Sequence, residues 1–189
     1  MGRKPQITKE IILEAALRML IRDGYAAITV KTLADEIGCS TQPIVWHFDN
    51  MGGFRKAFFE YCIAYAKSQF TAFSNSLDTL LAETARGHIS IACNTPHLFR
   101  FLFAGTQEDC SFAAVMQVLQ LENRKNILQI LCQEKDLNVQ QATSFLMNYE
   151  FYIHGIASYT ASGFCHYRED EIIAMANRAK DAFLAYEKQ

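Results

Sequence analysis

Residues 28–48 read ITVKTLADEIGCSTQPIVWHF, and this stretch decides the fold of the chain. Apolar residues at helical spacing after the N-cap residue Thr29 predict a first short helix. Gly38 follows, and glycine most easily takes the left-handed backbone that ends a helix and turns the chain. Ser40 or Thr41 can cap a second helix, and the small Ala34 lets that helix cross closely. The stretch therefore predicts a helix-turn-helix, whose second helix would lie in the major groove of DNA.

A longer stretch around this motif resembles the DNA-binding domain of the TetR family of transcriptional regulators. It covers about residues 8–59 and includes ILEAALRMLIRDGYAAITVKTLADEIGCSTQPIVWHF. The order of features is specific: a helix capped by Thr8, an aromatic residue after Gly24, a helix that ends in Gly38, and a short helix that ends in an aromatic-His-Phe triplet. The resemblance covers about a quarter of the chain. It implies a three-helix N-terminal domain on a helical, dimeric body.

The composition indicates a folded and mostly helical protein. Half of the residues are hydrophobic and 20% are charged, which is typical of a globular chain rather than a disordered one. Only three prolines and nine glycines occur. We predict an all-α fold of about nine helices. A helix-turn-helix DNA-binding domain is expected over residues 1–52, and a helical effector-binding and dimerisation domain over residues 53–189.

The charge is distributed unevenly along the chain. The net charge is −2, so the protein as a whole is not a basic nucleic-acid binder. Residues 1–67 carry nine Lys and Arg against seven Asp and Glu, whereas the remainder carries nine against thirteen. A mildly basic N-terminal part on an acidic body fits a DNA-reading domain joined to a domain with another task.

The six cysteines do not form CxxC pairs or stand beside histidine at metal-ligand spacing. The chain has no N-terminal apolar signal segment, so we expect free thiols in a cytoplasmic protein. No uncharged run of strongly apolar residues is long enough to span a membrane, and no membrane partner is expected.

DNA reading is expected from the start of the second helix and from a short basic arm before the first. The predicted DNA-binding residues are Thr29, Lys31, Ser40, Thr41, Gln42, Pro43, Val45, Trp46 and His47, with Arg3 and Lys4 in the arm. Gln42 is the best base reader, because its amide can pair bidentately with adenine. Since proline disfavours a helical residue before it, we expect the helix to begin at Pro43 with Gln42 outside it. The resemblance implies that Trp46 and His47 contact the DNA backbone; the alternatives are a core-edge aromatic and a capping or packing histidine.

The stretch departs from the usual family pattern in the residues that meet phosphate. Val45 stands where the family often has a phosphate-binding tyrosine. Residues 49–53 read as a linker, and Met51, Gly52 and Gly53 stand where a lysine and acidic residues usually open the next helix. Few strong cationic contacts remain, so we predict a shallow salt dependence, on the order of four to six phosphates per dimer.

The resemblance implies an effector pocket among the middle helices. The candidate ligand-binding residues are His97, Phe99, Arg100, Phe103, Phe112, Met116, Phe145, Asn148, Tyr149 and Tyr152. A lining of aromatic residues and methionine suits a mostly apolar ligand. The alternative, a filled core, stays open because aromatic residues at helical spacing are usually core.

A helix predicted over residues 139–162 has an unusual charge pattern. Between Asp136 and Arg168 the only formally charged residue is Glu150. A solvent-facing helix normally has a charged face, so this helix is predicted to be covered nearly all round. A second copy of the chain is the simplest cover, and a monomer with a deeply buried central helix is the alternative. The predicted interface residues are His154, Gly155, Ser158, Tyr159, Ser162, Ala176 and Phe183.

These patterns predict a TetR-like DNA-binding regulator, a repressor released from its operator by a small, mostly apolar ligand. Its partners would be double-stranded operator DNA, a second copy of itself and an unknown effector. The alternatives are a ligand-independent regulator and an activator of the same fold. The sequence contains no catalytic motif, P-loop or metal-ligand spacing, so we expect no enzyme activity, metal or cofactor.

Overall fold

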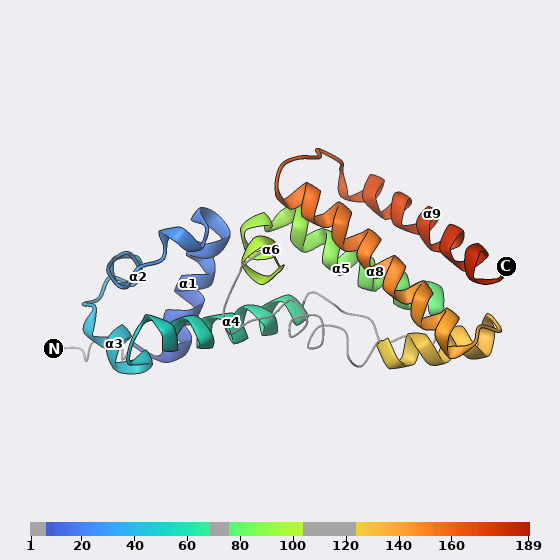
Figure 1. Ribbon diagram of the computed structural model, residues 1–189. Coiled ribbons are helices and arrows are strands. Elements are labelled where there is room, and N and C mark those ends of the chain that lie inside the picture. The colour runs from blue at the N-terminus through green and yellow to red at the C-terminus, as the bar shows by residue number, and fades with distance from the viewer. Residues whose placement is uncertain (1–6, 69–75, 104–123) are drawn as a thin grey trace.

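The computed structural model describes residues 7–68, 76–103 and 124–189. Within these ranges every regular element is a helix, which confirms the predicted all-α fold. The molecule is elongated, with α1 to α4 at one end, α5, α8 and α9 at the other, and α6 between them (Figure 1). In the same ranges, no helix is both long enough and apolar enough to cross a membrane.

With one exception, the N-terminal helices begin and end where their capping residues predict. They are α1 (Lys9–Asp23), the 3-10 helix η1 (Tyr25–Ala27), α2 (Val30–Ile37) and α3 (Gln42–Phe48). The Thr8 hydroxyl accepts a hydrogen bond from the Ile11 backbone N–H and caps α1. Gly24 ends α1 at φ 84°, and Gly38 ends α2 in the left-handed conformation at φ 75° and ψ 36°. The helix-turn-helix is therefore present as predicted.

The start of α3 differs from the prediction. The helix begins at Gln42, with Pro43 as its second residue, so the prediction that it begins at Pro43 is wrong. The first four N–H groups of a helix have no partner within it, so proline at the second position removes no hydrogen bond. Thr41 stands at the N-cap without a side-chain capping bond.

The remaining helices follow the predicted order. They are α4 (Met51–Ser68), α5 (Leu77–Asn94), α6 (Pro96–Phe103), a helix over residues 124–134, α8 (Val139–Ala161) and α9 (Glu169–Glu187). Asn138 caps α8 as predicted, and Gln141 completes a capping box. The α4 helix begins at Met51, so it takes up part of the stretch predicted to be a linker. The expected domain boundary after residue 52 thus falls in the first turn of α4.

The side chains form two hydrophobic cores. The first core joins α1 to α4 with α6, and it also takes Ala157 and Ala161 from the end of α8. The second core lies among α5, α8, α9 and residues 124–134. Since α6 packs against α1 and α4 on one side and α5 and α8 on the other, it connects the helix-turn-helix end to the rest of the molecule.

Candidate nucleic-acid interface and the helices behind it

The outer face of α3 presents side chains that have no role in the core. Ile44 and Phe48 are buried and hold the helix on the first core. Gln42 is exposed, and Val45 and Trp46 are 49% and 72% exposed. Such exposure of the Trp46 side chain argues against its being a core-edge aromatic. The helix therefore offers an amide and two apolar side chains outward, beside the exposed residues Ser40 and Thr41.

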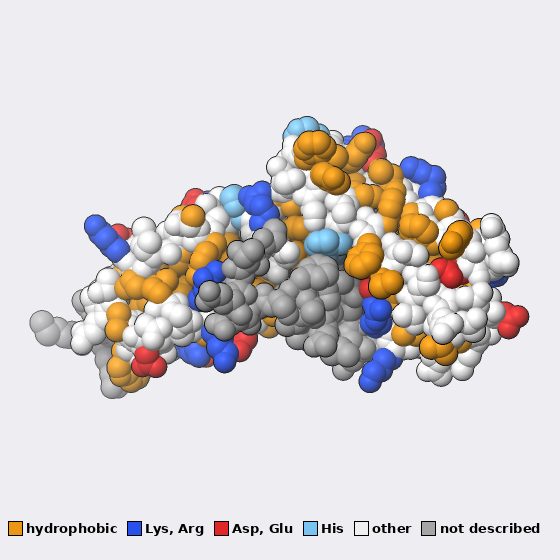
Figure 2. All heavy atoms as spheres, in the orientation of Figure 1, with side chains coloured by type: hydrophobic (Ala, Val, Ile, Leu, Met, Phe, Trp, Pro, Cys, Tyr) orange, Lys and Arg blue, Asp and Glu red, His pale blue; other side chains and the backbone are white. Residues whose placement is uncertain are grey.

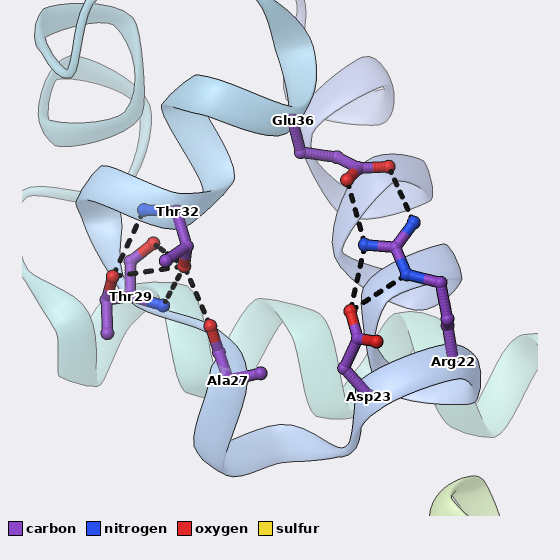
Figure 3. A network of polar contacts seen from close by, with 6 residues as sticks. All are labelled: Arg22, Asp23, Ala27, Thr29, Thr32 and Glu36. Carbon is purple, nitrogen blue, oxygen red and sulfur yellow. Dashed lines mark hydrogen bonds and ion pairs between the residues drawn. The ribbon is translucent and has the colours of Figure 1, made fainter.

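Thr29 is exposed at the start of α2, but its hydroxyl serves a capping box (Figure 3). The Thr29 Oγ1 accepts from the Thr32 N–H at 3.1 Å, and the Thr32 Oγ1 accepts from the Thr29 N–H at 2.9 Å. The Thr32 hydroxyl also lies 2.7 Å from the Ala27 carbonyl oxygen and donates to it. Thr32 was missed in the sequence because the usual capping-box signal has Glu or Gln, not Thr, three residues after the N-cap. Lys31, next to this cap, is exposed, and the predicted arm residues Arg3 and Lys4 lie outside the described residues.

An ion-pair network connects α2 to α1 (Figure 3). The Arg22 guanidinium, in the last turn of α1, donates to both carboxylate oxygens of Glu36 on α2, with Nη2 3.0 Å from Oε2. Arg22 Nε also donates to Asp23 at 2.9 Å. The Arg22 hydrogen bond lowers the pKa of Glu36. The pair is exposed and contributes little stability, but its bidentate geometry fixes the orientation of the two helices.

His47 turns away from the outer face of α3. Its Nε2 lies 2.9 Å from the backbone carbonyl oxygen of Ile7, and the side chain is partly buried. The ring also contacts Trp46 edge-on, with centroids 4.7 Å apart. This geometry matches the packing alternative for His47 rather than a side chain free to reach the DNA backbone.

The turn between α3 and α4 is unusually tight. Asp49 has φ 61°, and the Asn50 N–H donates to the Phe48 carbonyl oxygen at 2.6 Å. The Asn50 side chain then accepts from the Gly53 N–H at 3.0 Å. A Cβ on Gly53 would lie 2.3 Å from the Phe48 carbonyl oxygen, which no side chain allows. Glycine at position 53, one of the departures from the family pattern, is therefore required by the backbone of this turn.

Two polar residues of α6 connect it to its neighbours. The Arg100 Nη1 donates to the Ala161 carbonyl oxygen at the end of α8, and its Nη2 lies 2.9 Å from His97 Nδ1. His97 packs on the turn after α1, where a Cβ on Gly24 would lie 2.7 Å from His97 Nδ1. A cation at the carbonyl end of a helix is favourable. His97 and Arg100, predicted as ligand contacts, thus link α8 to α1.

Aromatic and histidine side chains gather where α5, α6 and α8 meet. Phe99 and Phe103 contact each other with centroids 4.8 Å apart, and each contacts both His88 and His154. His88 Nε2 lies 3.2 Å from His154 Nδ1, and His154 Nε2 lies 3.3 Å from the Ser158 hydroxyl. Burial lowers the pKa of His88 to about 3 and also lowers that of His154. Two neutral imidazoles therefore lie among the aromatic ligand candidates. His88 was not predicted as a ligand contact, because a lone histidine in an apolar run carries no motif.

The other ligand candidates lie further along α8. Tyr149 is buried, its hydroxyl has no hydrogen-bond partner among the described residues, and burial raises its pKa. Phe145 stacks on it with centroids 6.0 Å apart. Asn148 is partly buried, and Tyr152 contacts Phe183 of α9. Phe112 and Met116 lie outside the described residues.

An apolar stripe runs along the outer side of α8. Met147, Phe151 and Tyr159 are exposed, Phe151 by 60%, and Gly155 stands between them at the same four-residue spacing. Figure 2 shows hydrophobic side chains gathered over the α8 and α9 half of the molecule. Glu150, the one charged residue of this helix, is partly buried and paired with Arg124. The stripe itself is therefore uncharged.

The predicted interface residues divide between this stripe and the protomer's own core. Tyr159 and Ser162 are exposed, and Gly155 and Ser158 are partly exposed. Ala176 is only 1% exposed and packs in the second core, so its prediction as an interface residue is corrected. As described above, His154 bonds to His88 and Phe183 contacts Tyr152 within the protomer.

The described cysteines are free thiols, as expected. They are Cys39, Cys62, Cys93, Cys132 and Cys165, and Cys110 lies outside the described residues. In the part of the chain that the structure describes, no three His, Cys, Asp or Glu side chains are placed to hold a metal ion.

Comparisons with known proteins agree with this arrangement. The profile of the family described as "Bacterial regulatory proteins, tetR family" matches residues 12–58, which contain α2, α3 and the first part of α4. No curated protein sequence matches the chain.

Two similar solved structures extend the comparison to the whole fold. TetR from Acinetobacter baumannii AYE has 18% sequence identity and a TM-score of 0.63. A point variant of that protein, in complex with minocycline, has 19% identity and a TM-score of 0.60. Each comparison covers 97% of both chains, and at these identities it shows the fold. Residues 12–58 therefore carry the DNA-binding domain of the TetR family, and the chain has the fold of the TetR structures along its length.

Proposed function

We propose that the protein is a homodimeric operator-binding repressor, which leaves DNA when a small and mostly apolar molecule binds. The exposed face of α3 is the observation that carries this proposal. Gln42 offers an amide that can pair with adenine, and Val45 and Trp46 offer apolar surface suited to a thymine methyl group. Exposed apolar side chains that lie next to each other, as Val45 and Trp46 do, are typical of a surface that a partner covers.

Dimerisation is supported by the uncharged stripe on α8. Exposed Met147, Phe151 and Tyr159 form a continuous apolar surface that a second copy can cover. Gly155 and Ser158 are small enough to let a crossing helix approach. A two-fold pair of α3 helices can then engage half-sites about one helical turn of DNA apart.

Control by a ligand is supported by the position of α6. The helix contacts α1 and α4 on one side and α5 and α8 on the other. A molecule that enters beside Phe99 and Phe103 would displace α6, and His97 and Arg100 would pass that displacement to α1 and α8. A coupling of about 1–3 kcal/mol is enough to release DNA. The minocycline complex of the A. baumannii TetR variant supports a small-molecule effector for this fold.

The first test is a binding isotherm on the DNA upstream of the protein's own gene, repeated with a library of apolar metabolites and drugs. The chain has a single tryptophan, Trp46, so its fluorescence reports directly on α3. We expect tight binding that one compound weakens. Replacing Gln42 with Ala should relax the preference among operator variants without loss of helix content. No binding by a folded dimer to that DNA, or to any sequence selected from a random pool, would refute the proposal.

A ligand-independent regulator is the second candidate. It is favoured by the burial of Phe99, Phe145 and Tyr149, which fill the space between helices as core residues do. In that case the same assay would show tight DNA binding, and no compound in the library would change the affinity.

A further inference from the structure

We propose that α3 reads its operator through a methyl group in the major groove, so that it accepts 5-methylcytosine in place of thymine at one position of each half-site. The inference rests on the proposed DNA binding and names the chemistry that its recognition face selects. Its basis is the composition of that face, on which one amide lies beside two exposed apolar side chains.

The three outward residues of α3 share one side of the helix. Gln42, Val45 and Trp46 follow one another at spacings of three and four residues, which places their side chains on the same face. All three are exposed. Ile44 and Phe48, on the other side, are buried in the first core. The packing of these two residues therefore fixes which side of α3 faces outward.

Helix α3 has none of the side chains that usually read a G·C pair. Its sequence is QPIVWHF, without an Arg or Lys to donate to guanine O6 and N7 and without an Asp or Glu to accept from the cytosine amino group. The His47 ring is turned aside, with its Nε2 2.9 Å from the Ile7 carbonyl oxygen. The groups left for base contact are an amide that suits adenine and an apolar surface that suits a methyl group.

The methyl group is the part of thymine that such a surface detects. It projects from C5 of the base into the major groove, and its burial against Val45 and Trp46 removes apolar area from water. 5-Methylcytosine carries a methyl group at the same ring position, whereas uracil and cytosine lack it. Thymine and 5-methylcytosine differ at C4, where one has an oxygen and the other an amino group. Val45 makes no hydrogen bond, so only the Trp46 indole N–H can distinguish them on this surface.

The size of the methyl contact follows from its area. Removing one buried methyl-sized group should weaken binding about four-fold. A two-fold dimer meets the same base in both half-sites, so removing both methyl groups should weaken binding about 15-fold.

The DNA side of the test uses the sequence bound in the isotherm above, or one selected from a random pool, and follows the fluorescence anisotropy of labelled DNA. Each thymine is replaced by uracil in both half-sites together. At the position where uracil weakens binding most, the pair is then changed to C·G and to 5-methyl-C·G. We expect 5-methylcytosine to bind about 15-fold more tightly than cytosine. Uracil equal to thymine at every position, or 5-methylcytosine no better than cytosine, would overturn the inference while wild-type binding stays intact.

The protein side of the test assigns the methyl contact to this face. In Val45→Ala with Trp46→Ala, the uracil operator should bind within about four-fold of the thymine operator, because little apolar surface remains. Gln42→Ala is the matched control and should keep the full uracil effect, since its amide acts at another base. Trp46→Phe keeps a ring without the indole N–H and should also keep it.

An unchanged uracil effect in the double variant would place the methyl contact elsewhere and overturn the inference. Because both side chains are exposed, circular dichroism should show the helix content of the wild type. Val45→Thr is a milder second variant, which exchanges one methyl group for a hydroxyl and should also reduce the uracil effect. Absence of wild-type binding to any DNA would instead refute the proposed function.

Discussion

Replacing Gly24 with Ala tests the contact between the turn after α1 and helix α6. Gly24 has φ 84° and ψ 166°, a region that is essentially reserved for glycine. A Cβ there would also lie 2.7 Å from His97 Nδ1, so the His97 side chain must move. That movement breaks its contact with Arg100, which holds the end of α8.

The two costs have different sizes and can be separated. Backbone strain in such a region costs about 1–3 kcal/mol. Loss of the hydrogen bond between His97 and Arg100 adds about 1 kcal/mol. Gly24→Ala should therefore lower the free energy of unfolding by about 2–4 kcal/mol. In a His97→Ala background only the strain remains, so the same change should cost about 1 kcal/mol less.

The assay is urea denaturation followed by circular dichroism, with midpoints compared at equal slope. Gly38→Ala is the matched control, because Gly38 also has a positive φ, 75°, but its Cβ would meet no atom within 4 Å. It should cost about 1–2 kcal/mol whether or not His97 is present. Equal costs of Gly24→Ala in the two backgrounds would show that His97 does not contact this turn and would refute the reasoning.

Three further predictions concern the dimer, the buried histidines and the DNA contacts. A Cβ at Gly155 would meet no atom of its own protomer within 4 Å, so Gly155→Ala should stabilise α8 by roughly 1 kcal/mol. The same change should weaken the dimer, measured by sedimentation equilibrium. An unchanged dimer affinity would show that Gly155 is not in the interface. Burial lowers the pKa of His88 to about 3, so below pH 6.5 the unfolded chain binds a proton that the native chain does not. The free energy of unfolding therefore decreases as the pH decreases. Between pH 7 and 5 this site should contribute a loss of about 2 kcal/mol, which calorimetry should find missing in His88→Leu. With Arg3, Lys4 and Lys31 as the main cations, the log–log salt slope of operator binding should be no steeper than about −8, and a steeper slope would mean that phosphate contacts were overlooked.

Local features of the fold were predictable from the sequence because they depend on neighbouring residues. Thr8, Gly38 and Asn138 cap or end helices through bonds within a few positions of themselves. The periodicity of α8 and its single charge likewise follow from adjacent residues. These signals placed the helix-turn-helix and the outward residues of α3.

Contacts between distant parts of the chain were not predictable in the same way. His47 meets Ile7, and Arg100 meets Ala161, only because helices from different regions pack together. Both side chains were expected to face a ligand or DNA, since their residue type suits that role equally well. Ala176 was placed at the interface from helical spacing alone, which does not say which neighbouring helix covers a face.

The turn at Gly53 has a consequence for how the protein can change its target. The close approach to the Phe48 carbonyl oxygen is a demand of the backbone, and it is independent of the outward side chains of α3. Gln42, Val45 and Trp46 are exposed, so replacing them removes little buried contact area. Under the proposed function, substitutions at these three residues would therefore change the operator that is bound at little cost to folding, whereas position 53 admits no replacement. The proposed operator preference could then change by single substitutions while the backbone that presents these residues stays the same.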